Sequence, residues 1–214
     1  MASSSRPIFS WLAKVRPITI IGDGWSATQL DLRKLPGLII AVNDAAIYAP
    51  HWHIVVSMDR IWAENRVEQL KHRGQPVWLR RSTVKNFADF PTLVKFDCDH
   101  TSVTLNDEPG RLNGTHSGFC ALNLAYQMRP REIYLVGFDM QLGPKGERHW
   151  YPPYPWKNGG GTGASRLTEW SKQFYVAAAQ LRKVGCRVFV AGGASIPGFE
   201  TIDRAGLENV PRET

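Results

Sequence analysis

The sequence predicts an α/β protein whose mostly parallel sheet is covered by helices on both faces. Short apolar runs alternate along the chain with segments of helical periodicity, the pattern of a parallel sheet with crossover helices. Several of these runs are apolar at every position, as expected for strands that are buried on both sides. A chain of 214 residues with 43% hydrophobic and 21% charged residues is large enough to bury one such core. We therefore expect a single domain over residues 1–214.

Local sequence signals define the expected elements. A helix opens at the small-residue turn Thr115–Gly118 and continues to about Met128. The clearest helical periodicity runs from about Arg166 to Val184 and stops at Gly185, and another helix is expected from about Ile61 to His72. The expected strands are the short apolar runs Ile18–Ile21, Leu38–Val42, Ile54–Ser57, Val77–Leu79, Leu93–Phe96, Ile133–Val136 and Arg187–Ala191.

Two segments do not fit this alternation. Ser82–Arg111 has weak periodicity and is open to three interpretations: an irregular strand, a lid or an edge hairpin. Leu142–Ser165 is loop-like, and a loop of this length inside a compact domain is usually functional or disordered. Its aromatic content favours a lid or an acceptor-binding loop. The residues assigned to this lid are Arg148, Trp150, Tyr151, Tyr154 and Trp156.

The charge balance indicates an acidic partner without identifying it. The formal net charge is +7 and the pI is about 9.5, which suits a nucleotide phosphate, a nucleic acid or a membrane surface. The basic residues are scattered, so a merely solvated surface is an equal alternative. No apolar run is long enough to span a membrane, and residues 1–17 lack the apolar core of a signal peptide. We therefore expect a cytoplasmic protein in which Cys98, Cys120 and Cys186 are reduced thiols.

Polar residues follow the first three expected strands. Gly22-Asp23-Gly24-Trp25-Ser26 comes after the first strand, but Ala27 interrupts the dinucleotide fingerprint, so a purely structural turn is also possible. Asn43 follows the second strand and Asp59 the third. Because the carboxyl ends of parallel strands meet at one edge of a sheet, these residues are expected to share a rim.

A later segment supplies two further walls for a nucleotide pocket. Thr115-His116-Ser117-Gly118 begins a helix, where free N–H groups attract anions and glycine permits close approach. Asp139 ends the strand that follows. His149 stands in the next loop, where its imidazole could accept a proton from an attacking hydroxyl. A chance loop histidine is the competing interpretation.

In this order, these motifs resemble a known family. Ile20–Ser26, Val42-Asn43, Ser117-Gly118 and Ile133–Asp139 are similar to motifs of the bacterial sialyltransferases built on one Rossmann-like domain. The related group comprises motility-accessory-factor and hydroxymethylpterin-diphosphokinase-like proteins, and similar small phage proteins carry a His-Trp pair after the same strand. The resemblance covers about residues 18–199 and implies a sialyltransferase-like variant of a single Rossmann-like domain.

The resemblance also implies roles for individual residues. His149 matches the position of the family's catalytic base, and the family works without a bound metal, so no cofactor beyond the nucleotide-sugar donor is expected. The family's Asn-Gly-Pro-Ser turn is Asp23–Ser26 here, and Asp59 stands near a usual Asn, which leaves the donor sugar and base open. The implied nucleotide-binding residues are Gly22, Asp23, Gly24, Trp25, Ser26, Asn43, Asp59, Thr115, His116, Ser117, Gly118 and Asp139.

The leading hypothesis is a metal-independent glycosyltransferase that moves a sugar from a nucleotide sugar to an acceptor hydroxyl. The acceptor would be a glycan or a hydroxymethylated base in phage DNA, in which case the compartment would be the host cytoplasm. One alternative is a pterin or nucleotide diphosphotransferase, which would need Mg²⁺ at Asp97, Asp99 or Asp139. Another is a non-catalytic module that binds nucleotide or nucleic acid. The sequence leaves the oligomeric state open.

Overall fold

The fold is a single α/β domain built on a nine-stranded, all-parallel sheet. The structure, a computed structural model, describes residues 17–84, 87, 90–156 and 164–211; residues 1–16 of the predicted domain and residues 157–163 of the predicted lid lie outside this part. The strand order is β6-β5-β4-β3-β2-β1-β7-β8-β9. The strands are β1 (Ile18–Ile21), β2 (Leu38–Val42), β3 (Ile54–Ser57), β4 (Val77–Arg80), β5 (Leu93–Asp99), β6 (Arg111–Asn113), β7 (Glu132–Val136), β8 (Arg187–Ala191) and β9 (Glu200–Ile202).

The predicted α/β class is confirmed, and every predicted strand is present. The sequence did not reveal β6 and β9, which have three residues each and lie at the two edges of the sheet. Of the alternatives for Ser82–Arg111, the edge hairpin is wrong, because β5 pairs with β6 in parallel. This segment instead holds β5 and the connection to β6.

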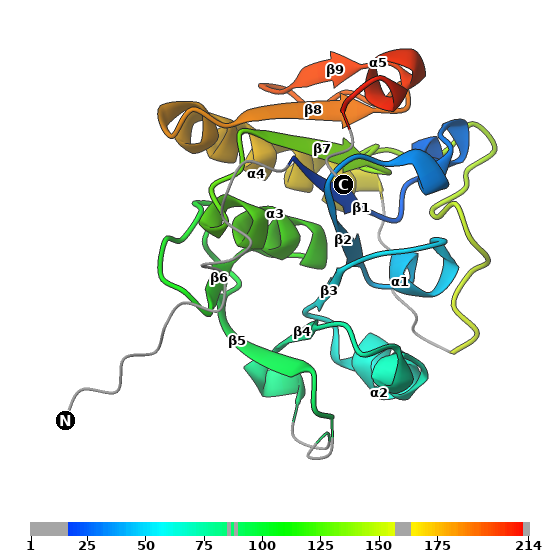
Figure 1. Cartoon of the computed structure of the whole chain (residues 1–214), viewed down its shortest axis with the longest axis vertical. Coiled ribbons are helices and arrows are strands. Elements are labelled where there is room, and N and C mark those ends of the chain that lie inside the picture. The colour runs from blue at the N-terminus through cyan, green and yellow to red at the C-terminus, as the bar shows by residue number, and fades with distance from the viewer. Residues whose placement is uncertain (1–16, 85–86, 88–89, 157–163, 212–214) are drawn as a thin grey trace.

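Helices cover both faces of the sheet (Figure 1). The helices α3 (Ser117–Gln127) and α4 (Ala164–Lys183) pack on one face, and α1 (Ala45–Tyr48), α2 (Arg60–Leu70) and α5 (Arg204–Glu208) pack on the other. Short 3₁₀ turns complete the connections: η1 (Trp25–Gln29), η2 (Leu32–Lys34), η3 (Lys71–Arg73) and η4 (Arg81–Thr83).

The side chains of the apolar strands pack into two separate cores, one on each face of the sheet. Successive side chains of a strand point to opposite faces, so Ile20 packs with α3 and α4 while Ile21 packs in the cluster that holds α1 and α2. Both side chains are fully buried, which explains why the strand is apolar at every position. All three cysteines are free thiols, although Cys98 is only partly buried.

The chain changes direction at β1. The strands β2 to β6 extend the sheet to one side of β1, and α3 then carries the chain back across the sheet to β7 on the other side. Open parallel sheets bind ligands at such a switch point, beyond the carboxyl ends of the strands. The turn after β1 is in direct contact with the end of β7 here: Gly22 N donates to Val136 O at 2.8 Å, and Gly24 N donates to Gly137 O at 2.8 Å.

This contact explains the glycines that follow β1. A Cβ atom at Gly22 or Gly24 would stand 2.7 Å from the Gly137 carbonyl oxygen, closer than packing allows. The glycine-rich turn therefore lets β1 and β7 end side by side. Within the described residues, no helix has the length and apolar character needed to cross a membrane.

Candidate active site

A cleft of about 370 Å³ opens at the switch point, beyond the carboxyl ends of β1, β2, β3 and β7. Its volume lies in the range of small-molecule sites. Most of the predicted site residues line this one cleft, although they come from five separate segments of the chain. Those lining it are Gly22, Asp23, Gly24, Asn43, Asp59, Thr115, His116, Ser117, Gly118, Asp139, Arg148, His149 and Tyr154.

The other predicted residues lie behind or beside the cleft rather than on its surface. Ser26 is buried, and its backbone N donates to the Asp139 Oδ2 at 2.8 Å. Trp25 packs against Gly143, whose added Cβ would meet the indole at 2.9 Å. Asp139 therefore anchors the turn after β1 to the end of β7, and burial raises its pKa against the hydrogen bonds from Ser26.

Asn43 and Asp23 face each other where β2 meets the first turn. Asn43 has a φ of 49°, a left-handed conformation that asparagine tolerates better than most residues, and this directs the chain from β2 into α1. Its Nδ2 donates to Asp23 Oδ2 at 3.4 Å. Burial raises the pKa of Asp23 to about 7, assisted by the nearby charge of Asp44 and opposed by hydrogen bonds from Tyr151 and Asn43.

The helix α3 points its amino terminus into the cleft. Its N-cap, His116, is extended and makes no side-chain cap hydrogen bond, so the first amides of the helix face the cleft without a capping side chain. Ser117 Oγ accepts a hydrogen bond from Met58 N at 3.1 Å, which fixes this end of α3 to the end of β3. Helix amino termini of this kind attract phosphate groups.

His116 belongs to an aromatic wall built with α4. Its ring stacks on Trp170 with centroids 4.2 Å apart and also contacts Phe119 and Phe174. Burial lowers the pKa of His116 to about 3, so the imidazole is neutral at physiological pH. Beside it, Thr115 Oγ1 bonds to Gln173 Oε1 at 2.8 Å, which joins the start of α3 to α4.

Asp59 has a structural role as well as a place in the cleft. Its carboxylate caps α2 by accepting hydrogen bonds from Ile61 N at 2.8 Å and Trp62 N at 3.2 Å. Deeper in this region, Asp44 is fully buried and pairs with Arg66 at 2.7 Å and with the Trp62 indole at 2.8 Å. These bonds hold α1 and α2 together behind the cleft.

The segment that carries His149 is fixed to the turn after β1. Trp150 N donates to Asp23 O at 3.1 Å, and Trp150 Nε1 donates to Gly22 O at 3.0 Å. The His149 ring stacks on Tyr151 with centroids 5.1 Å apart and an interplanar angle of 4°. Burial, followed by the charge of Arg148, lowers the pKa of His149 below its ordinary value. The imidazole is therefore neutral near pH 7 and able to accept a proton.

The aromatic residues of this loop form a packed stack instead of an exposed platform. Tyr151 is 7% exposed and stacks on Tyr48 with centroids 5.0 Å apart. Trp156 stacks on Tyr154 at 4.7 Å, and the Arg66 guanidinium lies 5.0 Å from the Trp156 ring centroid. The described part of the predicted lid is therefore a wall that packs against the α1 and α2 face.

Unsatisfied polar atoms concentrate around the cleft. Buried side-chain atoms without a hydrogen-bond partner are rare in folded proteins, and they mark places where a ligand or water belongs. Half of the buried unpartnered atoms identified in the described residues belong to side chains that line the cleft. They are Asp23 Oδ1, Asn43 Oδ1, His116 Nε2, Asp139 Oδ1 and His149 Nδ1.

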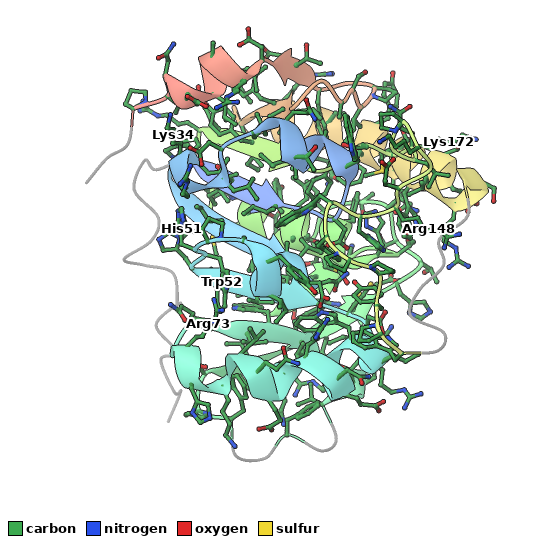
Figure 2. All side chains as sticks on the ribbon, turned by 90° about the vertical axis from the view of Figure 1, so that its right-hand side faces the viewer. Lys34, His51, Trp52, Arg73, Arg148 and Lys172 are labelled. Carbon is green, nitrogen blue, oxygen red and sulfur yellow. The ribbon has the colours of Figure 1, made fainter. Side chains whose placement is uncertain are left out.

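Two arginines at the cleft suit an anionic ligand. Arg148 and Arg166 both line it, and neither forms an ion pair with a described residue. Arg148 lies on the opposite side of the molecule from Lys34, His51 and Arg73, which precede β2, β3 and β4 (Figure 2). The free guanidinium groups thus lie at the same edge of the sheet as the amino terminus of α3.

The acidic pair considered for a metal lies elsewhere. Asp97 is bound by Arg81 at 2.7 Å, and Asp99 Oδ1 accepts hydrogen bonds from Thr101 and Ser102 in a local turn. Neither aspartate lines the cleft. Across residues 17–84, 87, 90–156 and 164–211, no three histidine, cysteine or acidic side chains gather in a way that could hold a metal ion.

Some residues of the cleft were missed by sequence reasoning. Arg166, Leu167 and Trp170, from the first turns of α4, also line the cleft. Met58 adds a thioether next to Ser117. An arginine and a tryptophan four positions apart at the start of a helix that follows the loop are the one signal that could have indicated this wall.

The same fold occurs in known enzymes. One is the sialyltransferase CstII from Campylobacter jejuni, solved with the substrate analogue cytidine-5'-monophosphate, with a TM-score of 0.58 and 14% identity over 93% of this chain and 90% of that one. A second structure, of sialyltransferase CST-II with a trisaccharide acceptor and CMP, gives a TM-score of 0.57 and 15% identity over 92% and 90%. This chain shares their fold. No family model and no curated protein sequence matches the chain.

Proposed function

We propose that the protein is a metal-independent glycosyltransferase that uses a nucleotide-sugar donor. The single observation that carries the proposal is the cleft itself. It brings together an uncapped helix amino terminus, a neutral histidine and two arginines that form no ion pair with a described residue, at the switch point of a parallel sheet. The shared fold with sialyltransferases supports the same conclusion.

In the proposed reaction, the nucleotide lies along the strand ends. Gly22, Gly24 and Asn43 would contact the nucleoside, while the amides of Ser117 and Gly118 would hold the phosphate. Charge grows on the phosphate as its bond to the sugar breaks. Arg148 and Arg166 would stabilise this charge, which makes the nucleotide a better leaving group.

His149 is proposed as the general base. Its Nδ1 is buried and has no partner among the described residues, and its lowered pKa keeps it neutral. It would remove the proton of an acceptor hydroxyl as the oxygen attacks the anomeric carbon. The bond from sugar to phosphate breaks, the nucleotide departs, and the proton remains on His149.

The acceptor is proposed to carry a hydroxyl group, as a glycan or as a hydroxymethylated base in phage DNA. Within this stack the buried Tyr151 ring is covered by Tyr48 and His149, so an extruded base could not stack on it. A glycan therefore fits the described surface better. The runner-up, a Mg²⁺-dependent diphosphotransferase, has less support. Asp97 and Asp99 lie outside the cleft, and Asp139, which lines it, belongs to no cluster of potential metal ligands among the described residues.

The proposal can be tested before the acceptor is known, because many glycosyltransferases slowly transfer the sugar to water. We expect cytidine monophosphate, the ligand of the similar structures, to raise the melting temperature by mass action. We also expect release of nucleotide from a cytidine-monophosphate sugar, with parallel arms for uridine- and guanosine-diphosphate sugars.

The His149→Ala variant should lower this turnover by about 10²- to 10⁴-fold, the usual contribution of a general base. Its dissociation constant for cytidine monophosphate should stay within about twofold of wild type, since the nucleotide contacts lie on other segments. Full turnover in this variant would remove His149 from the mechanism. Failure of every nucleotide to bind would overturn the proposed function.

A further inference from the structure

We propose that Cys98 and Cys120 form a site of reversible oxidation, at which hydrogen peroxide converts the two thiols into a disulfide. Their Sγ atoms lie 3.9 Å apart, although 22 positions separate the two residues in the chain. Neither residue lines the cleft. The proposal goes beyond the proposed function, because the disulfide can form without any nucleotide or sugar.

The fold brings the two cysteines together between the sheet and α3. Cys98 follows Phe96 by two positions in β5, so its side chain points to the face of the sheet that α3 covers. Cys120 lies in the first turn of α3 and packs into the same core. The Cys98 thiol also donates to Gly114 O at 3.5 Å, just before α3. A disulfide bond is about 2.05 Å long, so the two sulfur atoms have to approach by about 1.9 Å.

Cys98 is the thiol that a peroxide from solvent meets first. It is partly buried, whereas Cys120 is fully buried. Arg80 is aligned with Phe96 and so points to the same face, and its Nε is buried without a hydrogen-bond partner among the described residues. The hydrogen bond from Cys120 lowers the pKa of Cys98, burial and Asp99 oppose this shift, and the charge of Arg80 supports it. A lowered pKa provides more thiolate, which is the reactive form.

The oxidation consumes one molecule of hydrogen peroxide. The ionised sulfur of Cys98 attacks a peroxide oxygen, the O–O bond breaks, and the departing hydroxide takes up the proton that Cys98 has lost, which gives water and a sulfenic acid. The Cys120 sulfur then attacks the Cys98 sulfur and the S–O bond breaks. The departing hydroxide combines with the Cys120 proton to form a second water. The two thiols together lose two electrons, and the peroxide gains them.

The disulfide would act on the start of α3, the proposed phosphate site. Cys120 N donates to His116 O at 3.2 Å, which closes the first turn of this helix. The Cys120 sulfur also lies 4.0 Å from Met58 Sδ, and Met58 lines the cleft. Because Cys120 is closely packed, drawing its sulfur toward β5 shifts this turn and its amides. Oxidation should therefore weaken nucleotide binding, a consequence that rests on the proposed function.

Thiol counting and peptide mapping test the disulfide without any substrate. The reduced protein has three free thiols, and treatment of the folded protein with hydrogen peroxide should leave one, that of Cys186. Burial raises the pKa of Cys186 to about 12, so this residue stays a thiol. Trypsin cleaves after Arg111, between Cys98 and Cys120. The two peptides should appear joined in the mass spectrum and should separate on reduction.

Cysteine variants distinguish this pair from unspecific oxidation. Cys98→Ala and Cys120→Ala should each abolish the joined peptides, and Cys186→Ala, the matched control, should leave them unchanged. Cys98 is only partly buried, so Cys98→Ala decides the test if Cys120→Ala fails to fold. Three thiols that survive the peroxide, a disulfide that involves Cys186, or links between two copies of the chain in place of the internal bond would overturn the proposal.

Calorimetry with cytidine monophosphate tests the consequence at the cleft. Oxidised wild type should bind about three- to tenfold more weakly, the loss expected when one hydrogen bond to the phosphate is weakened, and dithiothreitol should restore the affinity. Cys98→Ala should bind equally well before and after peroxide, which excludes oxidation of Met58 as the cause. Unchanged affinity in the disulfide form would disprove the coupling to α3. If no nucleotide binds the reduced protein, the proposed function fails together with this coupling, and the peptide map still decides the disulfide.

Discussion

Burial changes the pKa values of Asp23 and His149 in opposite directions. An acid taken out of water is harder to ionise and a base is harder to protonate, so the pKa of Asp23 rises while that of His149 falls. Both groups consequently favour their neutral forms between the ordinary histidine pKa of 6.5 and pH 7. A neutral Asp23 also opposes the arrival of a phosphate-bearing ligand less than an ionised carboxylate would.

The protonation of Asp23 should be measurable in the stability of the fold. The native state holds this proton up to about pH 7, while the unfolded chain releases it near the ordinary value of 3.8. The stabilisation is complete below pH 3.8 and is lost as the pH rises through 7. Between pH 4 and 7.5, denaturant unfolding should show wild type losing on the order of 2–4 kcal/mol relative to Asp23→Asn. A constant difference across this range would contradict the raised pKa.

At the scale of elements, α3 connects the packing of the fold to the proposed phosphate site. Its first turn is fixed to β3 through Ser117 and Met58, and Gly118 lies tightly against Phe138 after β7. A Cβ atom at Gly118 would stand 2.9 Å from the Phe138 ring and 3.1 Å from His116 Nδ1. Close packing therefore leaves the first amides of α3 unobstructed toward the cleft.

Gly118→Ala should therefore weaken nucleotide binding. The added methyl group forces the start of α3 away from Phe138 and displaces the amides proposed to hold the phosphate, so we expect affinity for cytidine monophosphate to fall about tenfold or more by calorimetry. Gly206→Ala in α5 is the matched control, since its Cβ would be equally crowded at 2.9 Å from Ile202. Equal affinities for the two variants would show that the start of α3 does not contact the nucleotide.

The ion pair between α1 and α2 should matter for stability. Asp44 is fully buried and Arg66 is 12% exposed, so Arg66→Met leaves an uncompensated charge in the interior. We expect this variant to lose about 3 kcal/mol, the lower end of the range for a broken buried pair, since Trp62 still donates to Asp44. Arg60→Met, which breaks the exposed pair with Glu64, should cost about 0.3–0.5 kcal/mol in the same denaturation experiment. Similar losses would contradict this distinction.

The limits of the sequence analysis have physical causes that particular elements show. Strands such as Leu38–Val42 were predictable because burial on both faces requires an apolar residue at every position. Glu200–Ile202 was not, since its edge strand is short and half exposed. The cleft residues at strand ends could be predicted from the expected topology of the sheet. Trp170 could not, because it reaches the cleft through a tertiary contact with His116, which no local sequence pattern indicates.

The loop after β7 also shows that local sequence does not determine what an aromatic side chain packs against. Its aromatic residues predicted a lid or an acceptor-binding loop, and a ring in a loop can cover a ligand or pack against the protein with the same local sequence. Tyr151 packs, because Tyr48 and His149 enclose it.

For the whole molecule, the arrangement of charges predicts catalysis without a divalent ion. In the proposed reaction, Arg148, Arg166 and the start of α3 would supply the positive field that a metal gives to metal-dependent transferases. Donor turnover should therefore be unchanged after dialysis against EDTA and should not rise when Mg²⁺ or Mn²⁺ is added. A loss of more than about tenfold that Mg²⁺ restores would favour the diphosphotransferase alternative.

The pairing of β1 with β7 has a consequence for the protein during synthesis. Ile20 is aligned with Leu135, so the centre of the sheet is completed by a strand that leaves the ribosome long after its neighbour. Until then, β1 presents an open apolar edge, which is a template for aggregation. A nascent chain stalled before Glu132 should consequently recruit chaperones and resist solubilisation. The centre of the sheet can therefore form only after β7 has been synthesised, late in translation of the chain.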